Sequence, residues 1–268
     1  MDSDQPDHIS KKRAVYSLPT EGVTVRRGVE YRATDAGPLT LDLYHPPGAA
    51  EGAPTPAVLI VAGYPDPGFQ ARLGCKFKDM GSTVSWAELF AASGLAAITY
   101  TNHKPEDDLR ALLAHVRQNA ASLGIDETKL AIWASSGNVP LALSVLMRDA
   151  HEPLKCAALC YGFMLDLDGF TDVAETSKAI GFTNPNAGRS LEDLPQDLPL
   201  FITRAGQDQF PHLNETIDRF LAHAVARNLP ITFVNHPEGP HAFDLFHDSE
   251  TTREIIRQIL AFLRFHLT

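Results

Sequence analysis

Two adjacent serines stand where a strand pattern gives way to a helix pattern, in the stretch LAIWASSGNVPLAL at residues 130–143. The apolar run ends at Ser135 and Ser136, and a helix-like run follows at once with Pro140 in its first turn, where a missing N–H costs nothing. A serine hydroxyl in such a turn lies above the sheet, beside the positive end of a helix dipole, where it can act as a nucleophile. Serine is also a common helix cap, so this stretch alone leaves both roles open.

Steric demand distinguishes the two serines. The turn is so tight that the residues two before and two after a nucleophile must be small, and they are usually glycines. For Ser135 the preceding residue would be Trp133, which is too large, whereas Ser136 is flanked by Ala134 and Asn138. The spacing therefore predicts Ser136 as the nucleophile, with Asn138 as a departure from the usual motif.

A serine nucleophile needs a histidine base and an acid that orients the base, in the chain order serine, acid, histidine. Asp208 follows the apolar run at 198–206, and His241 follows the last apolar run, at 231–236. Taken singly, Asp208 could cap a helix ahead of Pro211, and His241 could be an ordinary surface or core histidine. Because all three residues follow strand ends in the required chain order, we predict that they act together.

Other residues could take these roles. Asp166 and Asp168 follow the preceding strand and are alternative acids, while His236 is an alternative base that ends its strand too early to reach back. A metal site built on His236 and His241 has neither helix spacing nor a third ligand, so we expect no metal.

Backbone N–H groups must also stabilise the negative charge that develops on the substrate oxygen. One donor is expected from Gly137, the residue after the nucleophile. The loop GYPDPG at residues 63–68 should supply the other, and since Pro65 has no N–H, Tyr64 is the better candidate. The same loop can also be read as a turn alone.

The elements that must position these residues follow from the pattern of apolar residues. Residues 22–33 and 39–46 alternate in the manner of an antiparallel hairpin. Six short apolar runs typical of buried parallel strands follow, at 57–63, 95–101, 129–134, 155–162, 198–206 and 231–236. Helical stripes fill the gaps, so we predict an α/β protein with an eight-stranded, mostly parallel sheet, helices on both faces and ligands at the carboxyl ends of the strands.

The predicted domain organisation is simple: a flexible N-terminus at 1–12 and a single domain at 13–268. Within it, residues 162–195 are too long for a strand-to-helix loop and should form a small cap-like insertion over the strand ends. Phe163 and Met164, with Phe170 and Phe182, could line an apolar pocket beside Asn138, although packing within the segment is the more common use of such side chains.

Composition narrows the partners. The 268-residue chain has a formal net charge of −10 and no extended basic run, which argues against nucleic acid and anionic membrane surfaces. No apolar stretch is long enough to span a membrane. Of three cysteines, Cys156 and Cys160 share one predicted strand and are too far apart to pair, so we expect a cytoplasmic protein. A homodimer remains open, as the commonest assembly of soluble proteins.

Together these segments resemble the α/β-hydrolase superfamily, and within it the dienelactone-hydrolase-like and small carboxylesterase branch, over residues 22–268. The resemblance implies Ser136 as nucleophile, Asp208 as acid, His241 as base, and Tyr64 and Gly137 as oxyanion donors. The chain has Ala62-Gly63 where many relatives have His-Gly, and it has Asn138 in place of a glycine. Its serine nucleophile, where dienelactone hydrolases have cysteine, argues against a dienelactone substrate.

The expected function is therefore hydrolysis of small to medium, mainly uncharged carboxylic esters through an acyl-enzyme, without a cofactor. A lactonase, amidase or peptidase with the same three residues is an alternative, as is a member of the fold that only binds a ligand.

Overall fold

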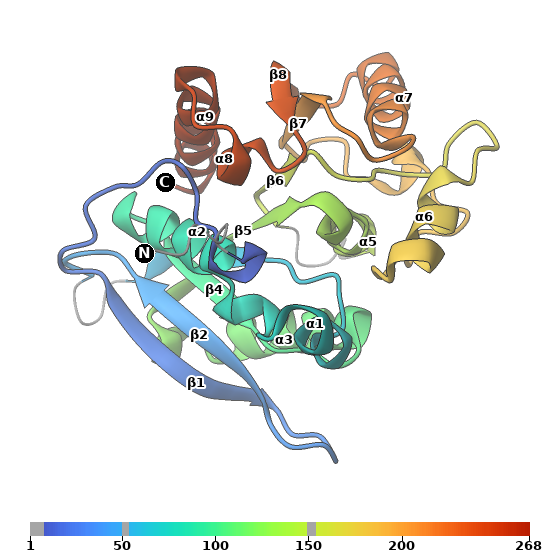
Figure 1. Cartoon of the computed structure of the whole chain (residues 1–268). Helices are drawn as coiled ribbons and strands as arrows, with labels where there is room; N and C mark the ends of the chain where they lie inside the picture. Colours follow the sequence, from blue (N-terminus) through green and yellow to red (C-terminus); the bar gives the residue numbers. More distant parts are fainter. Residues whose placement is uncertain (1–7, 50–53, 149–153) are drawn as a thin grey trace, which may run out of the picture.

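The computed structural model describes residues 8–49, 54–148 and 154–268, and within these ranges eight strands form one sheet in the order β1-β2-β4-β3-β5-β6-β7-β8 (Figure 1). The strands are β1 (Thr24–Arg32), β2 (Leu39–His45), β3 (Thr55–Ile60), β4 (Ala96–Tyr100), β5 (Ile125–Ser135), β6 (Cys156–Cys160), β7 (Leu200–Gln207) and β8 (Ile231–Pro240). β1 and β2 are antiparallel to their neighbours, and all pairs from β4 to β8 are parallel. The predicted eight-stranded, mostly parallel sheet is confirmed.

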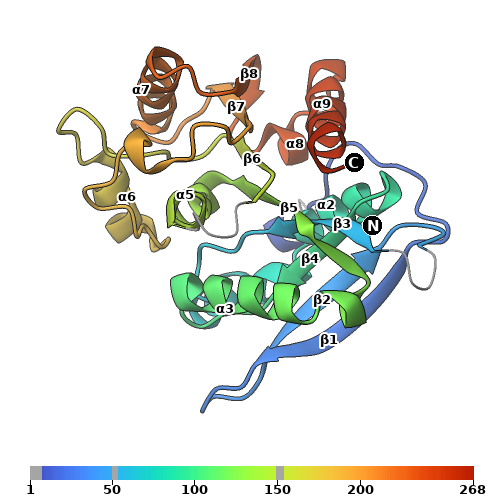
Figure 2. The same cartoon turned by 180° about the vertical axis from the view of Figure 1, so that it is seen from behind.

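Helices cover both faces of the sheet, as expected for parallel strands joined by crossovers. α2 (Gly81–Ala92) and α9 (Glu250–Leu267) pack on one face, and α3 (Pro105–Gln118), α5 (Val139–Arg148) and α7 (Leu213–Ala226) on the other (Figure 2). The shorter helices are α1 (Asp66–Leu73), α4 (Ala120–Leu123), α6 (Asp172–Ile180), α8 (Phe243–Phe246) and the 3₁₀-helices η1 (Ile9–Lys11), η2 (Phe77–Asp79), η3 (Ser136–Asn138) and η4 (Leu191–Asp193).

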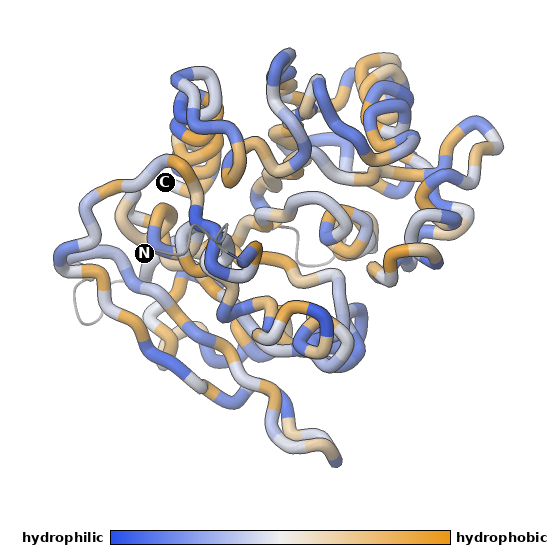
Figure 3. Tube along the Cα trace, in the orientation of Figure 1, coloured by the Kyte–Doolittle hydropathy of each residue, from blue (hydrophilic) through white to orange (hydrophobic). Residues whose placement is uncertain are grey.

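Burial explains the sequence pattern of both kinds of element. Every residue of β4 and β6 is buried, because helices cover these strands on two faces. Along α7 and α9, hydrophobic and hydrophilic positions alternate with the turn of the helix (Figure 3), and the apolar stripes predicted for both face the core. In the hairpin the alternating pattern, which predicted one solvated face, is not matched by the burial: β1 is mostly exposed and β2 mostly buried.

Two segments outside the main sheet and its covering helices, the N-terminus and residues 162–195, contain short helices. Of the N-terminus predicted to be flexible, residues 1–7 lie outside the described residues, whereas Ile9–Lys11 form η1 against α2. The segment 162–195 contains α6 and η4, and α6 packs on α7 beyond the strand ends.

Candidate active site

The chain turns sharply between β5 and α5, and Ser136 lies at the turn. Its backbone has φ of 55°, in the left-handed region that side-chain-bearing residues rarely adopt. The 3₁₀-helix η3 follows directly and α5 begins at Val139, slightly later than the start near Gly137 that the sequence predicted. Ser136 thus lies above the carboxyl end of a central strand, before a helix N-terminus.

Glycines allow neighbouring segments to approach this turn closely. A Cβ atom at Gly63 would lie 2.9 Å from both the Asn138 Cα and the Gly137 carbonyl oxygen. One at Gly162 would lie 2.2 Å from Val139 Cγ2. Both positions are closed to larger residues, so the segments after β3 and β6 lie against the turn that carries Ser136.

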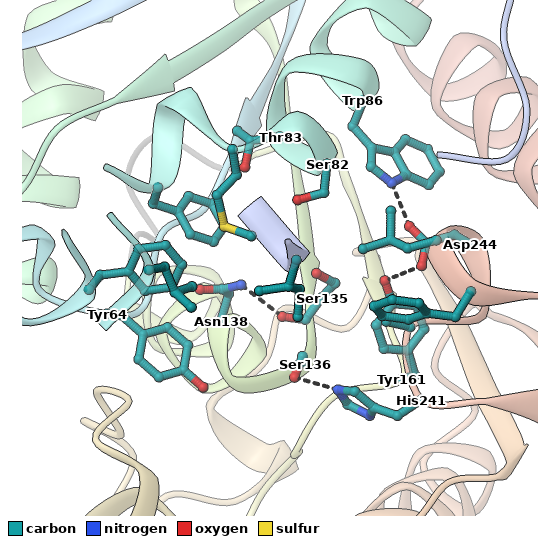
Figure 4. A pocket seen from close by; sticks show the side chains of 18 of the residues that line it. Tyr64, Ser82, Thr83, Trp86, Ser135, Ser136, Asn138, Tyr161, His241 and Asp244 are labelled. Carbon is teal, nitrogen blue, oxygen red and sulfur yellow. Dashed lines mark hydrogen bonds between the residues drawn. The ribbon is translucent and has the colours of Figure 1, made fainter. Parts of the chain in front are cut away.

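The structure brings the three predicted residues together. The Ser136 Oγ lies 2.8 Å from His241 Nε2 (Figure 4), and the His241 Nδ1 lies 2.7 Å from Asp208 Oδ2. The second distance requires Nδ1 to carry a proton, since the ionised carboxylate can only accept. Nε2 of a neutral imidazole is then an acceptor, positioned to take the Ser136 proton.

Asp208 is held in place by the end of β7. Its side chain is 0% exposed, and its Oδ1 accepts the Phe210 N–H at 2.9 Å. It is not the cap of α7, which begins five residues later with His212 at its N-cap. The alternative reading of Asp208 as a helix cap is therefore wrong.

The imidazole of His241 lies between two aromatic side chains. The rings of Tyr161 and Phe210 contact it edge to face, with centroid distances of 5.4 and 4.5 Å. The His241 side chain keeps 19% of its surface exposed. It is thus restrained by its neighbours and still accessible from the cavity.

Two backbone amides near Ser136 remain available. In the loop after β3, Ala62 N–H donates to the Tyr100 hydroxyl, Gly63 N–H donates to Asn138 Oδ1, and Asp66 N–H donates to the Asn102 carbonyl. Pro65 has no N–H. Among residues 61–66, all of which the structure describes, Tyr64 is therefore the one whose N–H donates to no other protein group. Gly137 N–H lies in the first turn of η3, where amides have no partner within the helix.

The rival residues lie in other settings. Asp166 accepts the N–H groups of Val173 and Ala174 at the start of α6, and Asp168 lies 3.0 Å from His223 Nε2 near the surface. His236 is buried beside Thr252, 3.0 Å from its Oγ1. None of the three is recorded in contact with Ser136.

A cavity of about 440 Å³ opens beside Ser136 and His241 and extends toward Thr83 and Trp86 (Figure 4). Its wall is rich in aromatic side chains. They come from the β3–α1 loop, α1, η2, α2, the ends of β5, β6 and β7, and α8: Tyr64, Phe69, Phe77, Trp86, Trp133, Tyr161, Phe210 and Phe246. Burial raises the pKa of Tyr64 to about 12, so its phenol stays protonated.

The residues predicted to bind substrate are divided. Asn138 lines the cavity, but Phe163 and Met164 do not. Phe163 stacks on Phe182 with a centroid distance of 5.4 Å, and Met164 is fully buried, with its N–H bonded to Thr216 Oγ1. The packing role that the sequence left open fits both, and the segment 162–195 contributes mainly Ile180 to the cavity.

Sequence reasoning missed a buried carboxylate in the cavity wall. Asp244, three residues after His241, accepts hydrogen bonds from the Tyr161 hydroxyl at 2.6 Å and from Trp86 Nε1 at 2.7 Å. Burial raises the pKa of Asp244 above its ordinary value. Tyr161 also contacts the His241 ring, so the hydrogen bonds of Asp244 to Tyr161 and Trp86 help to hold the imidazole in place. Only the motif PHAFD hinted at it.

The described residues offer neither a metal site nor a membrane-spanning helix. Among them, no group of three or more His, Cys, Asp or Glu side chains could hold a metal ion. No helix in the ranges 8–49, 54–148 and 154–268 is long and apolar enough to cross a membrane.

No protein-family model matches the chain, and no curated protein sequence matches it significantly. Solved structures do. A thermophilic esterase from the planctomycete Thermogutta terrifontis is 20% identical, with a TM-score of 0.68 over 95% of this chain and 95% of that chain. A bacterial heroin esterase is 15% identical, with a TM-score of 0.68 over 95% of this chain and 87% of that chain.

An α/β-hydrolase enzyme from a Medee basin deep-sea metagenome library is 16% identical, with a TM-score of 0.65 over 92% of this chain and 98% of that chain. At such identities the likeness shows the fold, which is that of the α/β-hydrolases, as the sequence predicted. It does not distinguish the dienelactone-hydrolase-like branch from others.

Proposed function

We propose that this protein is a serine hydrolase of carboxylic esters, with Ser136 as nucleophile, His241 as base and Asp208 as the acid that orients the base. The observation that carries the proposal is the chain of two contacts, 2.8 Å from Ser136 Oγ to His241 Nε2 and 2.7 Å from His241 Nδ1 to Asp208. A nucleophile, its base and an orienting acid in hydrogen-bond reach are the parts that acyl transfer requires.

The reaction follows from these contacts. His241 Nε2 takes the proton of Ser136 as its Oγ attacks the ester carbonyl carbon, while the Asp208 carboxylate stabilises the imidazolium that forms. The N–H groups of Gly137 and Tyr64 donate to the oxyanion. His241 then gives its proton to the departing alcohol, and a water molecule activated by the same base releases the acid from Ser136.

The cavity favours uncharged esters of modest size. Its volume of about 440 Å³ suits a small molecule, and its aromatic wall favours apolar groups. Structures of the Thermogutta terrifontis esterase hold propionate and butyrate, which are short acyl products. We therefore propose that its substrates are carboxylic esters with short to medium acyl chains.

Hydrolysis of a series of p-nitrophenyl esters from acetate to decanoate tests the proposal. We expect saturable hydrolysis by the wild type and a loss of at least about 10³-fold in kcat for Ser136→Ala, since the attacking atom is removed. Ser135→Ala is the matched control, one residue away in the same turn, and should keep most of the activity. An amide and a lactone of matched acyl length, assayed in parallel, separate the esterase from the amidase and lactonase alternatives.

The opposite results are equally clear. Hydrolysis that is unchanged in Ser136→Ala would contradict the assignment of the nucleophile. A wild type that binds these esters without cleaving them would point to the non-catalytic alternative.

A further inference from the structure

Asn138 connects two segments of the candidate active site through its side-chain amide. Its Oδ1 accepts the Gly63 N–H at 2.7 Å, and its Nδ2 donates to the Ser135 carbonyl at 2.9 Å (Figure 4). Gly63 belongs to the loop after β3, and Ser135 is the last residue of β5. With 4% of its surface exposed, Asn138 is buried between them.

The amide also determines which backbone donors remain free. Because Gly63 N–H is bonded to Asn138, it does not compete for a substrate oxygen, and Tyr64 N–H is left as the available donor of the loop. The other donor, Gly137 N–H, precedes Asn138 directly. Asn138 thus follows the Gly137 donor directly in the chain, and its side chain bonds to the loop that carries the Tyr64 donor.

Few side chains can make both contacts. Asparagine has an acceptor and a donor on one short planar group, whereas aspartate has two acceptors and would face the Ser135 carbonyl with one of them. Alanine or glycine would leave the Gly63 N–H buried without an acceptor, which costs about 1–3 kcal/mol and favours movement of the loop. The same close approach closes Gly63 to any side chain, since a Cβ atom there would lie 2.9 Å from the Asn138 Cα.

We propose that Asn138 is a positioning residue, which holds the Tyr64 N–H at the distance from the Gly137 N–H that an oxyanion requires. The proposal rests on the esterase function proposed above. This role gives a reason for asparagine at a position where the usual motif has glycine, because glycine has no side chain that could bond to the loop.

The test compares Asn138→Ala with Asn186→Ala as a matched control. Asn186 is also buried and donates to a backbone carbonyl in the same region, that of Pro140 at 2.6 Å, but within the described residues its side chain makes no hydrogen bond to the loop after β3. Its segment reaches that loop through the backbone of Thr183, whose N–H donates to the Gly63 carbonyl at 2.8 Å. Four quantities are measured: kcat and KM for p-nitrophenyl butyrate, the fraction of active sites by fluorophosphonate titration, and the inhibition constant of an alkyl trifluoromethyl ketone.

The ketone isolates the oxyanion step. Ser136 Oγ adds to its carbonyl carbon, the proton passes to His241, and the carbonyl oxygen becomes an oxyanion that the two amides must hold. We expect Asn138→Ala to lower kcat per active site by about 10- to 10³-fold. The upper limit is the loss seen when one oxyanion donor is removed altogether. KM should change little, and ketone inhibition should weaken in parallel with kcat. Asn186→Ala should alter the melting temperature without moving kcat or the inhibition constant.

An Asn138→Ala enzyme with wild-type kcat and wild-type ketone inhibition would overturn the proposal, as would a change confined to KM. If that variant does not fold, Asn138→Gly, which has the residue of the usual motif and also lacks both side-chain contacts, is measured instead. Full ketone inhibition of Asn138→Gly would equally overturn the proposal. Failure of the esterase function itself would be seen separately, as hydrolysis retained in Ser136→Ala or absent from the wild type.

Discussion

Ser136 combines an accessible hydroxyl with a strained backbone. A left-handed conformation costs a residue with a side chain about 1–2 kcal/mol, and Ser136 is held there at φ of 55° by the packing of Gly162 and Val139 around the turn. Strain that persists because its surroundings enforce it is common at functional sites. At this residue it directs Oγ toward His241 Nε2.

The role of Asp208 leads to a prediction about one residue. We expect Asp208→Asn to lower kcat for ester hydrolysis by about 10⁴-fold, because the amide can favour the wrong histidine tautomer and cannot stabilise the imidazolium. Steady-state kinetics on p-nitrophenyl butyrate measure this. Asp168→Asn is the matched control, since Asp168 also lies beside a histidine, His223, but outside the cavity. Full activity in Asp208→Asn would place the acid elsewhere.

Single residues differ in how far the sequence could predict them. Ser136, Asp208 and His241 could be placed because each follows a strand, and strand ends meet at one edge of a parallel sheet. The double contact of Asn138 could not be predicted, since it depends on how closely Gly63 approaches from another segment. Phe163 and Asp244 show the same limit: composition identifies an apolar or acidic residue, but only packing decides which of them reaches the cavity.

At the scale of elements, the segment from β8 to α8 presents His241, and a buried histidine anchors it. His236 is 1% exposed, and its Nε2 lies 3.0 Å from Thr252 Oγ1 on α9 and 3.2 Å from His247 Nδ1. A Cβ atom at Gly239 would lie 2.7 Å from the His236 ring, so the segment wraps closely around it. Burial lowers the pKa of His236 below its ordinary value.

This shift predicts a pH-dependent stability. The unfolded chain protonates His236 near its ordinary pKa of about 6.5, while the folded chain resists protonation until lower pH. The contribution of neutral His236 is therefore complete above about pH 7 and is lost as the pH falls below about 6.5. We expect the difference in unfolding free energy between wild type and His236→Gln, from urea titrations, to shrink between about pH 8 and pH 5.5. A difference that is constant across this range would contradict the assignment.

The N-terminal segment, residues 9–15, packs beside the cavity, although the sequence predicted a flexible end over residues 1–12. A Cβ atom at Gly81 of α2 would lie 2.6 Å from the Lys11 carbonyl oxygen. The Ala14 N–H donates to Ser85 Oγ at 2.9 Å, and the Val15 N–H donates to the Asp244 carbonyl at 2.8 Å. These contacts fix the segment against the cavity, where Ile9 contributes to the lining.

Ile9 should therefore affect which esters are accepted. We expect Ile9→Ala to favour longer acyl chains and Ile9→Trp to favour shorter ones. The ratio of kcat/KM for octanoate to that for acetate should move by about threefold to tenfold, in line with roughly 0.8 kcal/mol per buried methylene. Val25→Ala removes a similarly exposed aliphatic side chain from β1 and serves as control. An unchanged chain-length profile in both Ile9 variants would show that the segment does not shape the site.

At the scale of the whole molecule, the sequence predicted the number and direction of the strands but not their lateral order in the sheet. Short, wholly apolar runs are typical of strands covered on both faces, so the number and direction of the strands could be predicted. The lateral order did not follow from the sequence: β4 lies between β2 and β3, which no local pattern encodes. The course of residues 162–195 was equally inaccessible, because packing of α6 on α7 determines it.

The sheet accounts for the site as a whole. Ser136, Asp208 and His241 are separated by up to 105 residues in the chain, and they meet because β5, β7 and β8 run parallel and end at the same edge. The central claim is therefore that these strand ends make Ser136, and not Ser135, the nucleophile.

Labelling with a fluorophosphonate tests that claim most directly, because phosphorus forms a bond to the activated serine oxygen and fluoride leaves. The tryptic peptide of residues 130–148 carries both serines, so fragment masses assign the adduct. We expect one adduct, on Ser136, that is absent from Ser136→Ala and present in Ser135→Ala. An adduct on Ser135, or no adduct on an enzyme that hydrolyses esters, would contradict the assignment of Ser136 as the nucleophile.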